Sequence, residues 1–391
     1  MVKPFQFARL PLIFFGCGKR SDLSGLIRRY GTRIILVTRS AAITETGEAA
    51  IIFDSVAKKN IEIHNIVIDS EPYPRIIDDA VSGSEDFKPE VVVAIGGGSV
   101  MDAGKAISAM TGVKGSVVEY LEVIGNRNHP GTKIPFIAVP TTAGTGSEAT
   151  KNAVISVVGK EGFKRSLRHD NFVPDIAIVD PELTISCPVE LTASSGMDCF
   201  TQLVEAFLSD HSNEYTDALA LEGLKAVKSS LSAVNKNGKD VAARAGMSFA
   251  ALTSGICLAN AGLGVVHGFA SSIGGMFRIP HGVICGTLMA VSNELNIKKI
   301  RKGYGNHEAL KKYALLGELF LDEKGKSEDY YIDGFIDYLR LLTDELNLPG
   351  LKKYGIREND LEKICAITEC KNNPVQLEAS DLMEILLERY I

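Results

Sequence analysis

Two of the seven histidines, His267 and His281, lie fourteen positions apart in residues 264–282, a stretch rich in glycine and nearly free of charge. We expect this stretch to be buried, and a buried imidazole needs a hydrogen-bond partner, a charge or a metal ion. A Gly-Gly pair and Pro280 disfavour one unbroken helix, so we expect two helical pieces with a bend, each presenting one histidine. The alternative is a pair of core histidines that are hydrogen-bonded to carbonyl groups.

A second polar set lies in residues 196–205, which read as a helix. Asp198 and Gln202 are four residues apart and share one helix face, with Glu205 one turn further on. A carboxylate in a stretch poor in other charges needs a counter-charge, which a divalent cation supplies. Oxygen donors from Asp198 and Gln202, together with two imidazoles, suit Fe²⁺ or Zn²⁺ better than Ca²⁺ or Mg²⁺. The alternative is that Asp198 caps a helix and Gln202 is a polar core residue.

A glycine cluster follows the β-branched run at residues 91–95 and precedes a segment with helical character, residues 100–110. Glycines between a buried strand and a helix let backbone N–H groups approach a phosphate, and the helix N-terminus favours its negative charge. Since this is not the GxGxxG fingerprint, a tight strand-to-helix turn is the alternative, with Asp102 as a helix-start residue. The candidate phosphate-binding residues are Gly97, Gly98, Ser99 and Asp102.

A second loop, residues 140–150, follows the apolar run at 134–139 and combines glycines with hydroxyl groups that can donate to phosphate and ribose. Two such loops, each at the carboxyl end of a central strand, are more specific than either alone, because ligands of open α/β sheets bind at that edge. The sequence therefore predicts a nucleotide site. The candidate residues of the second loop are Thr141, Thr142, Thr145 and Ser147.

The chain as a whole has 391 residues, a net charge of −6 and no basic stripe, which argues against nucleic acid as a partner. The N-terminal apolar run, residues 10–15, is too short for a signal peptide or a membrane span and suits a buried strand. Seven scattered cysteines without a CxxC pair are typical of reduced thiols. We therefore expect a cytoplasmic protein with no membrane partner.

Apolar runs, with amphipathic stretches between several of them, fill the first half of the chain, the pattern of a doubly wound parallel, Rossmann-like α/β sheet. They cover 34–37, 91–95, 134–139 and 176–179, and residues 61–68 alternate in the way of a half-buried strand. Helical spacing then covers 193–208, 213–232, 241–258, 281–296, 333–346, 358–368 and 379–388. We predict an α/β domain over residues 1–182 and an all-α helical domain over residues 183–391.

Five segments carry a resemblance to a known family. They are GGGSVMDAGKA (96–106), PTTAGTGSEAT (140–150), IAIVDPEL (176–183), GMDCFTQLVEAF (196–207) and the 264–282 stretch. In this order they resemble the iron-containing (group III) alcohol dehydrogenases, which are related to glycerol dehydrogenase and dehydroquinate synthase. The resemblance runs from about residue 14 to near the C-terminus. It implies an NAD(P)-binding α/β domain and a helical domain, with a metal and the nicotinamide meeting in the cleft between them.

The resemblance implies that Asp198, His267 and His281 bind the metal. The family usually has a histidine where Gln202 stands; the amide is neutral like imidazole but a weaker donor, so we expect looser metal binding with Gln202 as the fourth ligand. Ser271 occupies the position of a usual histidine near the nicotinamide that can relay a proton. A serine passes a proton only as a link in a chain, completed here by water or the cofactor ribose. His267 and Ser271 are the candidate catalytic residues.

The cofactor preference depends on the end of the 34–37 strand. Many NAD-specific relatives have an Asp where Arg39 stands, and an arginine can pair with a 2′-phosphate, so we expect NADP rather than NAD. A solvated surface arginine is the alternative. Lys164 matches a family lysine that contacts the cofactor ribose, with a plain surface lysine as its alternative.

The combined prediction is a metal-dependent NAD(P)-linked alcohol dehydrogenase or aldehyde reductase, with Fe²⁺ or Zn²⁺ as the metal. The expected partner is a small alcohol or aldehyde, and the family implies a homodimer. A metal-independent reductase of oxo-acids, of the maleylacetate reductase type, is one alternative, and a non-catalytic nucleotide-binding sensor is another.

Overall fold

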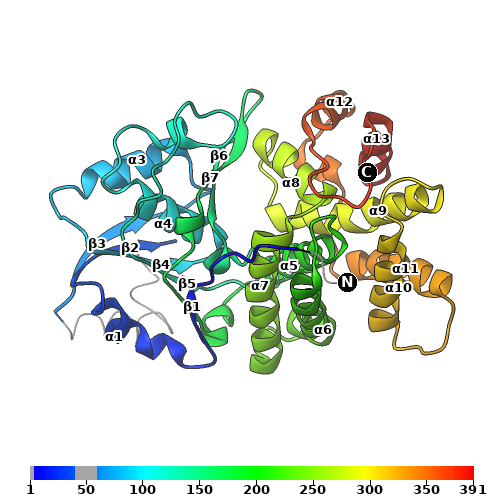
Figure 1. The fold of residues 1–391 in the computed structure, drawn as a ribbon, viewed down its shortest axis with the longest axis horizontal. Helices are drawn as coiled ribbons and strands as arrows, with labels where there is room; N and C mark the ends of the chain where they lie inside the picture. The colour runs from blue at the N-terminus through cyan, green and yellow to red at the C-terminus, as the bar shows by residue number, and fades with distance from the viewer. Residues whose placement is uncertain (1–3, 40–59) are drawn as a thin grey trace.

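The computed structural model describes residues 4–39 and 60–391, which form a sheet domain and a helical domain side by side (Figure 1). A six-stranded, all-parallel sheet has the order β1-β8-β5-β4-β2-β3. Its strands are β1 (Leu12–Phe15), β2 (Arg33–Thr38), β3 (Glu62–Val67), β4 (Val91–Gly96), β5 (Phe136–Pro140) and β8 (Ile176–Val179). The predicted doubly wound sheet is confirmed, and its order reverses direction between β2 and β4, where such sheets bind ligands.

Both faces of the sheet are covered. On one face, Ile35 and Val37 of β2 join the core of α3 (Pro74–Gly83) and α4 (Gly98–Met110). On the other face, Ile34 and Leu36 join the core that contains α1 (Leu23–Ile27). Alternate residues of one strand are therefore buried on opposite sides, which explains why the central strands are continuous apolar runs in the sequence.

The N-terminal strand differs from its prediction. β1 is an edge strand paired only with β8, and Leu12 remains 52% exposed, so the expected burial of this strand was wrong. The segment before β1 runs across the helical domain, where the Ala8 amide donates to Asn260 Oδ1 at 2.6 Å (Figure 1). This segment thus ties the two domains together.

A hairpin that the sequence analysis missed lies between the domains. Strands β6 (Asn152–Val157) and β7 (Phe163–Arg168) pair antiparallel, with β6 against α4 and β7 against α8 (Val265–Met276). Three of the six residues of β7 are cationic, so it lacks the apolar run that marked the other strands. The hairpin forms one wall of the space between the domains.

The helical domain begins after a short 3-10 helix, η6 (Pro181–Thr184). Its longer helices are α5 (Val189–Leu208), α6 (Glu214–Lys236), α7 (Val241–Ala261), α8, α9 (His281–Arg301), α10 (Glu308–Leu321), α11 (Glu328–Glu345), α12 (Glu358–Ile367) and α13 (Ala379–Glu388). The all-α prediction is confirmed, although α10 was missed. Its buried positions, Ala309, Tyr313, Leu316 and Phe320, do have helical spacing.

The predicted bend between the two histidines is confirmed, but at a different place. Gly274 and Gly275 lie inside α8, and the break comes at residues 277–280, with Pro280 as the N-cap of α9. A Cβ atom at Gly275 would lie 3.4 Å from the Lys164 backbone, and one at Gly274 would lie 3.3 Å from the Lys164 side chain, so β7 packs closely against these glycines. They serve helix–strand packing rather than helix breaking.

Helix α7 is the one described helix that is long and apolar enough to cross a membrane by composition, and 67% of its most apolar window is buried inside the protein. It packs against α5, α6 and the second glycine-rich loop. At Gly255 of α7, a Cβ atom would lie 2.1 Å from the carbonyl oxygen of Gly146, so only glycine permits this approach. Helix α7 is therefore a core helix that positions a loop of the sheet domain.

Candidate metal and nucleotide site

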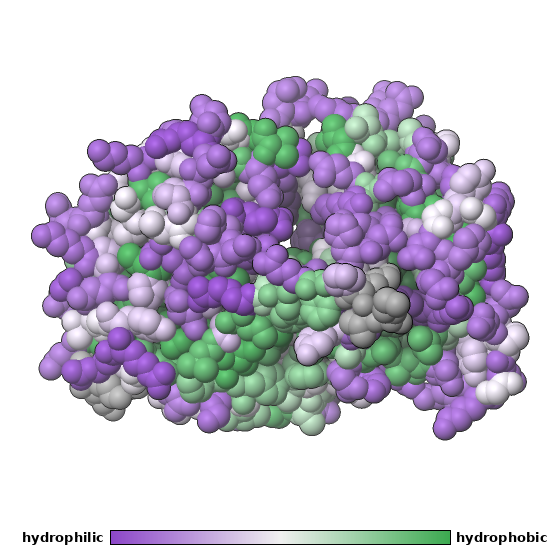
Figure 2. All heavy atoms as spheres, viewed as in Figure 1, coloured by the Kyte–Doolittle hydropathy of each residue, from purple (hydrophilic) through white to green (hydrophobic). Residues whose placement is uncertain are grey.

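A cleft of about 760 Å³ lies between the sheet domain and the helical domain. Figure 2 shows a recess at the centre of the molecule, between the two halves that Figure 1 separates. The α4 N-terminus, the second loop and the β6–β7 hairpin line one side, and α5, α8 and the start of α9 line the other. Residues from both predicted sites therefore face one space.

Three helices bring the predicted metal ligands together at the bottom of this cleft. Asp198 lies in the middle of α5, His267 in the first turn of α8 and His281 at the start of α9. A Cβ atom at Gly282 would lie 1.9 Å from the carbonyl oxygen of Ser194, so glycine is needed for α9 to begin against α5. Because Asp198 is inside a helix, the alternative in which it caps one is wrong.

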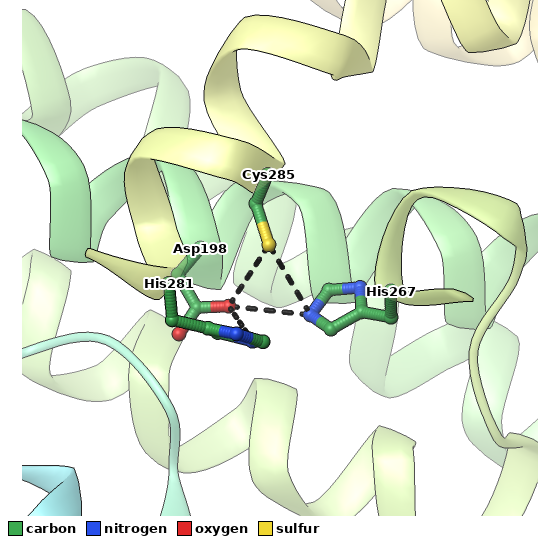
Figure 3. Close-up of side chains that lie close together, drawn as sticks. All are labelled: Asp198, His267, His281 and Cys285. Carbon is green, nitrogen blue, oxygen red and sulfur yellow. Dashed lines mark hydrogen bonds and ion pairs between the residues drawn. The ribbon is translucent and has the colours of Figure 1, made fainter. Parts of the chain in front are cut away.

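The side chains point toward one another (Figure 3). His267 Nε2 lies 3.2 Å and His281 Nε2 lies 3.7 Å from Asp198 Oδ1, and the two ring centroids are 5.4 Å apart. Asp198 and His267 are 2% and 4% exposed. The structure thus brings these three predicted residues into one buried cluster.

Glu205 fixes the orientation of the His267 ring. Its Oε2 lies 2.6 Å from His267 Nδ1, and its Oε1 accepts from the Val266 amide at 2.7 Å. A carboxylate can only accept, so His267 Nδ1 carries the hydrogen and Nε2 faces Asp198. A carboxylate behind a histidine is the usual support for a metal-binding imidazole.

The electrostatics of the cluster favour a bound cation. Burial raises the pKa of Asp198, but His281 and His267 outweigh it, so the net direction is downward. Burial lowers the pKa of His267, yet Cys285, Glu205 and Asp198 together raise it well above its usual range. In the protein alone, a proton on His267 offsets the buried negative charge, and a divalent cation can take that place.

His281 is suited to bind such a cation. Burial lowers its pKa to about 4 despite the opposing charge of Asp198, so the ring is neutral near pH 7. Its Nδ1 is buried without a hydrogen-bond partner in the described part of the chain. A neutral imidazole has a free lone pair, which a metal ion requires.

The sequence analysis did not identify Cys285. Its Sγ lies 3.7 Å from His267 Nε2 and 3.8 Å from Asp198 Oδ1, and the ligand atoms of Asp198, His267, His281 and Cys285 all lie within 4.8 Å of one another. The spacing in the sequence could have revealed it, because Cys285 follows His281 by four residues and the two therefore share one face of α9. Burial raises the pKa of this thiol to about 11.

Gln202 lies beside the cluster in a different arrangement from the predicted one. Its Nε2 donates to Asp198 Oδ1 at 3.3 Å, while its Oε1 accepts from Ser254 Oγ at 3.2 Å. The amide oxygen is therefore directed at α7, and the amide hydrogens face the carboxylate. In this arrangement Gln202 supports Asp198 and lines the cleft.

Ser271 stands one turn after His267 and lines the cleft. Its hydroxyl donates to the His267 carbonyl oxygen at 2.9 Å. Lys371, which the sequence analysis also missed, donates from Nζ to the same carbonyl at 3.0 Å and to Ser271 Oγ at 3.3 Å. Burial lowers the pKa of Lys371 below its ordinary value. A lysine thus stands beside the position where the family usually has a histidine.

The two predicted nucleotide loops lie against each other at the carboxyl ends of β4 and β5. A Cβ atom at Gly97 would lie 3.2 Å from the Thr142 side chain, and one at Gly98 would lie 2.8 Å from that of Thr145. The predicted cofactor residues that line the cleft are Gly98, Ser99, Asp102, Thr145, Ser147 and Lys164. Those not among its lining residues are Gly97, Thr141, Thr142 and Arg39.

Asp102 and Ser147 already have protein partners. Ser147 Oγ donates to Asp102 Oδ1 at 2.6 Å, and the Val154 amide donates to Asp102 Oδ2 at 3.1 Å. The buried Lys105 donates to Ser147, Thr150 Oγ1 and the Asn152 carbonyl. These contacts lock α4, the second loop and β6 together, so both side chains hold the loop in shape.

Lys164 and Arg39 differ in their surroundings. The Lys164 side chain is only 9% exposed and pairs with Glu71 Oε1 at 2.7 Å, so the surface-lysine alternative is wrong. Arg39 follows the end of β2, next to the point where the strand order reverses, and is exposed to solvent. Lys164 faces the cleft from the hairpin side, and Arg39 lies at the rim of the sheet.

The donor set fits a divalent transition metal. Two imidazoles, one buried and one partly exposed, and a buried carboxylate, with a thiol in reach, are the ligand types that Zn²⁺ and Fe²⁺ take in proteins. A parallel-sheet domain with two glycine-rich loops faces this set across one cleft. Fold and site together define a two-domain oxidoreductase that uses a nicotinamide dinucleotide and a metal ion.

Comparison with known proteins agrees. Residues 11–181 match the family model described as "Iron-containing alcohol dehydrogenase", and residues 192–390 match "Fe-containing alcohol dehydrogenase family, C-terminal". The chain is 31% identical to alcohol dehydrogenase 4 of Saccharomyces cerevisiae over 97% of both chains. It therefore belongs to the iron-containing alcohol dehydrogenase family, and it is an oxidoreductase that acts on alcohols.

Solved structures give the same result. A 1,3-propanediol oxidoreductase superimposes with a TM-score of 0.88 at 26% identity, over 99% of this chain and 100% of that one. A sulfoacetaldehyde reductase from Bifidobacterium kashiwanohense, in complex with NAD⁺, superimposes with a TM-score of 0.84 at 26% identity over 99% of both chains. The predicted resemblance and fold class are thus confirmed.

Replacing Glu205 by glutamine tests the support of the His267 ring. Glutamine has one acceptor oxygen for the two donors that Glu205 now satisfies, so its amide hydrogens face one of them. We expect Glu205→Gln to lower Zn²⁺ affinity by about 10- to 100-fold, measured by competition with a chromogenic chelator. Glu190→Gln, on an exposed position of the same helix, is the matched control. An unchanged affinity would show that Glu205 does not support the metal site.

Proposed function

We propose that the chain interconverts an alcohol and its aldehyde at a divalent cation, Fe²⁺ or Zn²⁺, bound by Asp198, His267 and His281. The observation that carries this proposal is the convergence of these side chains at the bottom of a cleft lined by both nucleotide loops. When bound, the cation supplies a Lewis acid for the substrate oxygen, and the nicotinamide gives or takes the hydride.

The residues on the sheet side bind and orient the dinucleotide. The α4 N-terminus presents Gly98 and Ser99 to the cleft, which suits a pyrophosphate. Thr145 lies beside Gly98 and offers a hydroxyl, with Gly97, Thr141 and Thr142 in the layer behind.

Three further residues of the cofactor side act around this loop pair. Asp102 and Ser147 hold the two loops in place, and Lys164 reaches toward the ribose. The NAD⁺ complex of the related reductase supports a nicotinamide cofactor here.

The residues on the helical side position the substrate and move its proton. Ser271 is one link of the proton path, and the Lys371 ammonium beside it donates to its oxygen. This gives Ser271 a charged neighbour, which a serine needs because it cannot hold a proton near neutral pH. Apolar side chains close this end of the cleft and exclude water, namely Leu258, Leu263, Met276 and Ile367.

NADP is the cofactor that Arg39 favours. It stands at the end of β2, where an acidic residue would hold a 2′-hydroxyl, and its exposed guanidinium is available to a 2′-phosphate. If NADPH is the donor, aldehyde reduction is the main direction in the cell. All seven cysteines are free thiols, which is consistent with a cytoplasmic location.

A homodimer is supported by an apolar surface. Figure 2 shows apolar side chains gathered below the centre of the molecule, where Figure 1 places β1 and α7. Leu12 and Phe15 of β1 are 52% and 37% exposed, and Phe15 packs edge-on against the 39% exposed Phe249 of α7. An open edge strand beside such a patch favours pairing with a second copy.

The central test replaces His267 by alanine. We expect His267→Ala to lose the bound metal and to lower the rate of NADPH oxidation with aldehydes by more than about 100-fold, since both metal and orientation are lost. Metal content by elemental analysis and NADPH absorbance measure the two effects. His307→Ala, an exposed histidine on the helical domain, is the control. Full activity without bound metal would exclude the proposed mechanism.

Replacing Arg39 by alanine tests the cofactor preference. Loss of a charge-assisted hydrogen bond to the 2′-phosphate should raise the KM for NADPH by about 10- to 100-fold and leave the KM for NADH nearly unchanged. Steady-state kinetics with both cofactors measure this, with Arg29→Ala as the exposed control. Equal effects on the two cofactors would rule out a role for Arg39 in the preference.

Replacing Phe249 by aspartate tests the dimer. A charge in the apolar patch should destabilise association, so light scattering after gel filtration should give twice the chain mass for the native protein and one chain mass for Phe249→Asp. Leu341→Asp, at a 69% exposed position on α11, is the matched control. A variant that stays dimeric would place the interface elsewhere.

A further inference from the structure

We propose that Cys285 is a ligand of the metal, as a thiolate, together with Asp198, His267 and His281, and that Gln202 supports Asp198 instead of binding the ion. This inference rests on the proposed function, because it concerns the same cation. It gives the chain an Asp-His-His-Cys ligand set in place of the Asp and three histidines that the family pattern usually supplies.

The distances fit a tetrahedral ion. Zinc bonds of about 2.0 Å to oxygen and nitrogen and about 2.3 Å to sulfur require ligand atoms about 3.3 to 3.6 Å apart. The separations from Asp198 Oδ1 are 3.2 Å to His267 Nε2, 3.7 Å to His281 Nε2 and 3.8 Å to Cys285 Sγ, and Sγ lies 3.7 Å from His267 Nε2. Four of the six ligand-atom separations therefore lie within a few tenths of an ångström of this range, and all six are within 4.8 Å.

Helix α9 presents two of these ligands on one face. His281 opens the helix and Cys285 follows one turn later, so both side chains point at α5 and α8 (Figure 3). His267 and His281 line the cleft, whereas Cys285 and Asp198 are not among its lining residues. The thiol therefore approaches the ion from behind, and a substrate oxygen reaches it from the cleft side as a fifth ligand.

Gln202 has the opposite arrangement. Its oxygen faces Ser254 Oγ at 3.2 Å, a hydroxyl whose one hydrogen is shared with the Ala251 carbonyl at 2.8 Å. Its NH₂ group points at Asp198, where the amide hydrogens would repel a cation but stabilise the carboxylate. Helix α5 thus contributes one ligand and one supporting hydrogen bond. Gln202, at the position that usually carries a histidine, thus supports Asp198, and Cys285 supplies the fourth metal ligand.

Binding balances charge and protons. The Cys285 thiol loses its proton to solvent as the sulfur–metal bond forms, and His267 loses its extra proton as Nε2 binds, so two protons are released for each ion. One thiolate, one carboxylate and two neutral imidazoles then neutralise a divalent cation. A thiolate donor favours Zn²⁺ over Fe²⁺ and Mn²⁺ among the common divalent ions.

X-ray absorption at the zinc edge of the zinc-loaded native protein tests this directly. We expect one sulfur neighbour at about 2.3 Å, and in the cobalt-loaded protein a thiolate-to-cobalt charge-transfer band. Both signals should disappear in Cys285→Ala and remain in Gln202→Ala. Zn²⁺ affinity should fall about 100-fold in Cys285→Ala and less than about 10-fold in Gln202→Ala. Cys365→Ala, at a buried cysteine of α12, is the control.

The outcomes separate this inference from the proposed function. Bound zinc with only nitrogen and oxygen neighbours would overturn the inference and leave the proposed function intact. A sulfur neighbour that persists in Cys285→Ala would also overturn it, because another thiol would then be the ligand. A native protein that binds neither metal would overturn both. The native spectra need no variant, so the test stands even if Cys285→Ala fails to fold.

Discussion

The structure of the helical domain depends on the negative charge buried at its centre. Asp198 and Glu205 are 2% and 6% exposed, and within the described part of the chain their ion-pair partners are imidazoles. A buried carboxylate is costly unless a positive charge and hydrogen bonds balance it. Three helices, α5, α8 and α9, gather the donors that surround this charge, and the proposed divalent cation would take the place of the proton on His267.

This constraint also explains the arrangement of the two domains. The cluster lies at the bottom of a cleft whose other wall is the loop pair after β4 and β5, and Gly146 and Gly255 allow that loop to touch α7 directly. The β6–β7 hairpin fills the space beside α8 and holds Lys164 against Glu71. The second glycine-rich loop is thus positioned by contacts to the domain that holds the Asp198–histidine cluster.

The parts of this structure that could be predicted from the sequence are those encoded by local patterns. Continuous β-branched runs marked the buried strands, and the histidines, Asp198 and the glycine loops were visible because their residue types are rare in such settings. The hairpin was missed because the cations of β7 interrupt any apolar alternation. β1 is exposed because it lies at the edge of the sheet, and a local sequence pattern does not determine the order of the strands.

The missed site residues have a different cause. Cys285 was one of seven similar cysteines, and only the start of α9 shows that it shares a face with His281. Lys371 is separated from His267 by about a quarter of the chain, so only tertiary contacts reveal it. The helix face of Gln202 could be predicted from its spacing to Asp198, but the direction of its amide depends on Ser254 of α7, which no local pattern connects to it.

The three departures from the family pattern are linked by charge. With Cys285 as a thiolate, the bound cation is neutralised by one more negative charge than three imidazoles and a carboxylate would supply, and it therefore polarises a substrate oxygen less strongly. With a weaker Lewis acid, proton transfer to or from that oxygen depends more on neighbouring residues. Ser271 cannot transfer the proton alone, but the ammonium of Lys371 lies 3.3 Å from its hydroxyl. On this proposal, positive charge that is reduced at the metal is present at the neighbouring proton path, so the ligand change on α9 and the relay change on α8 compensate each other.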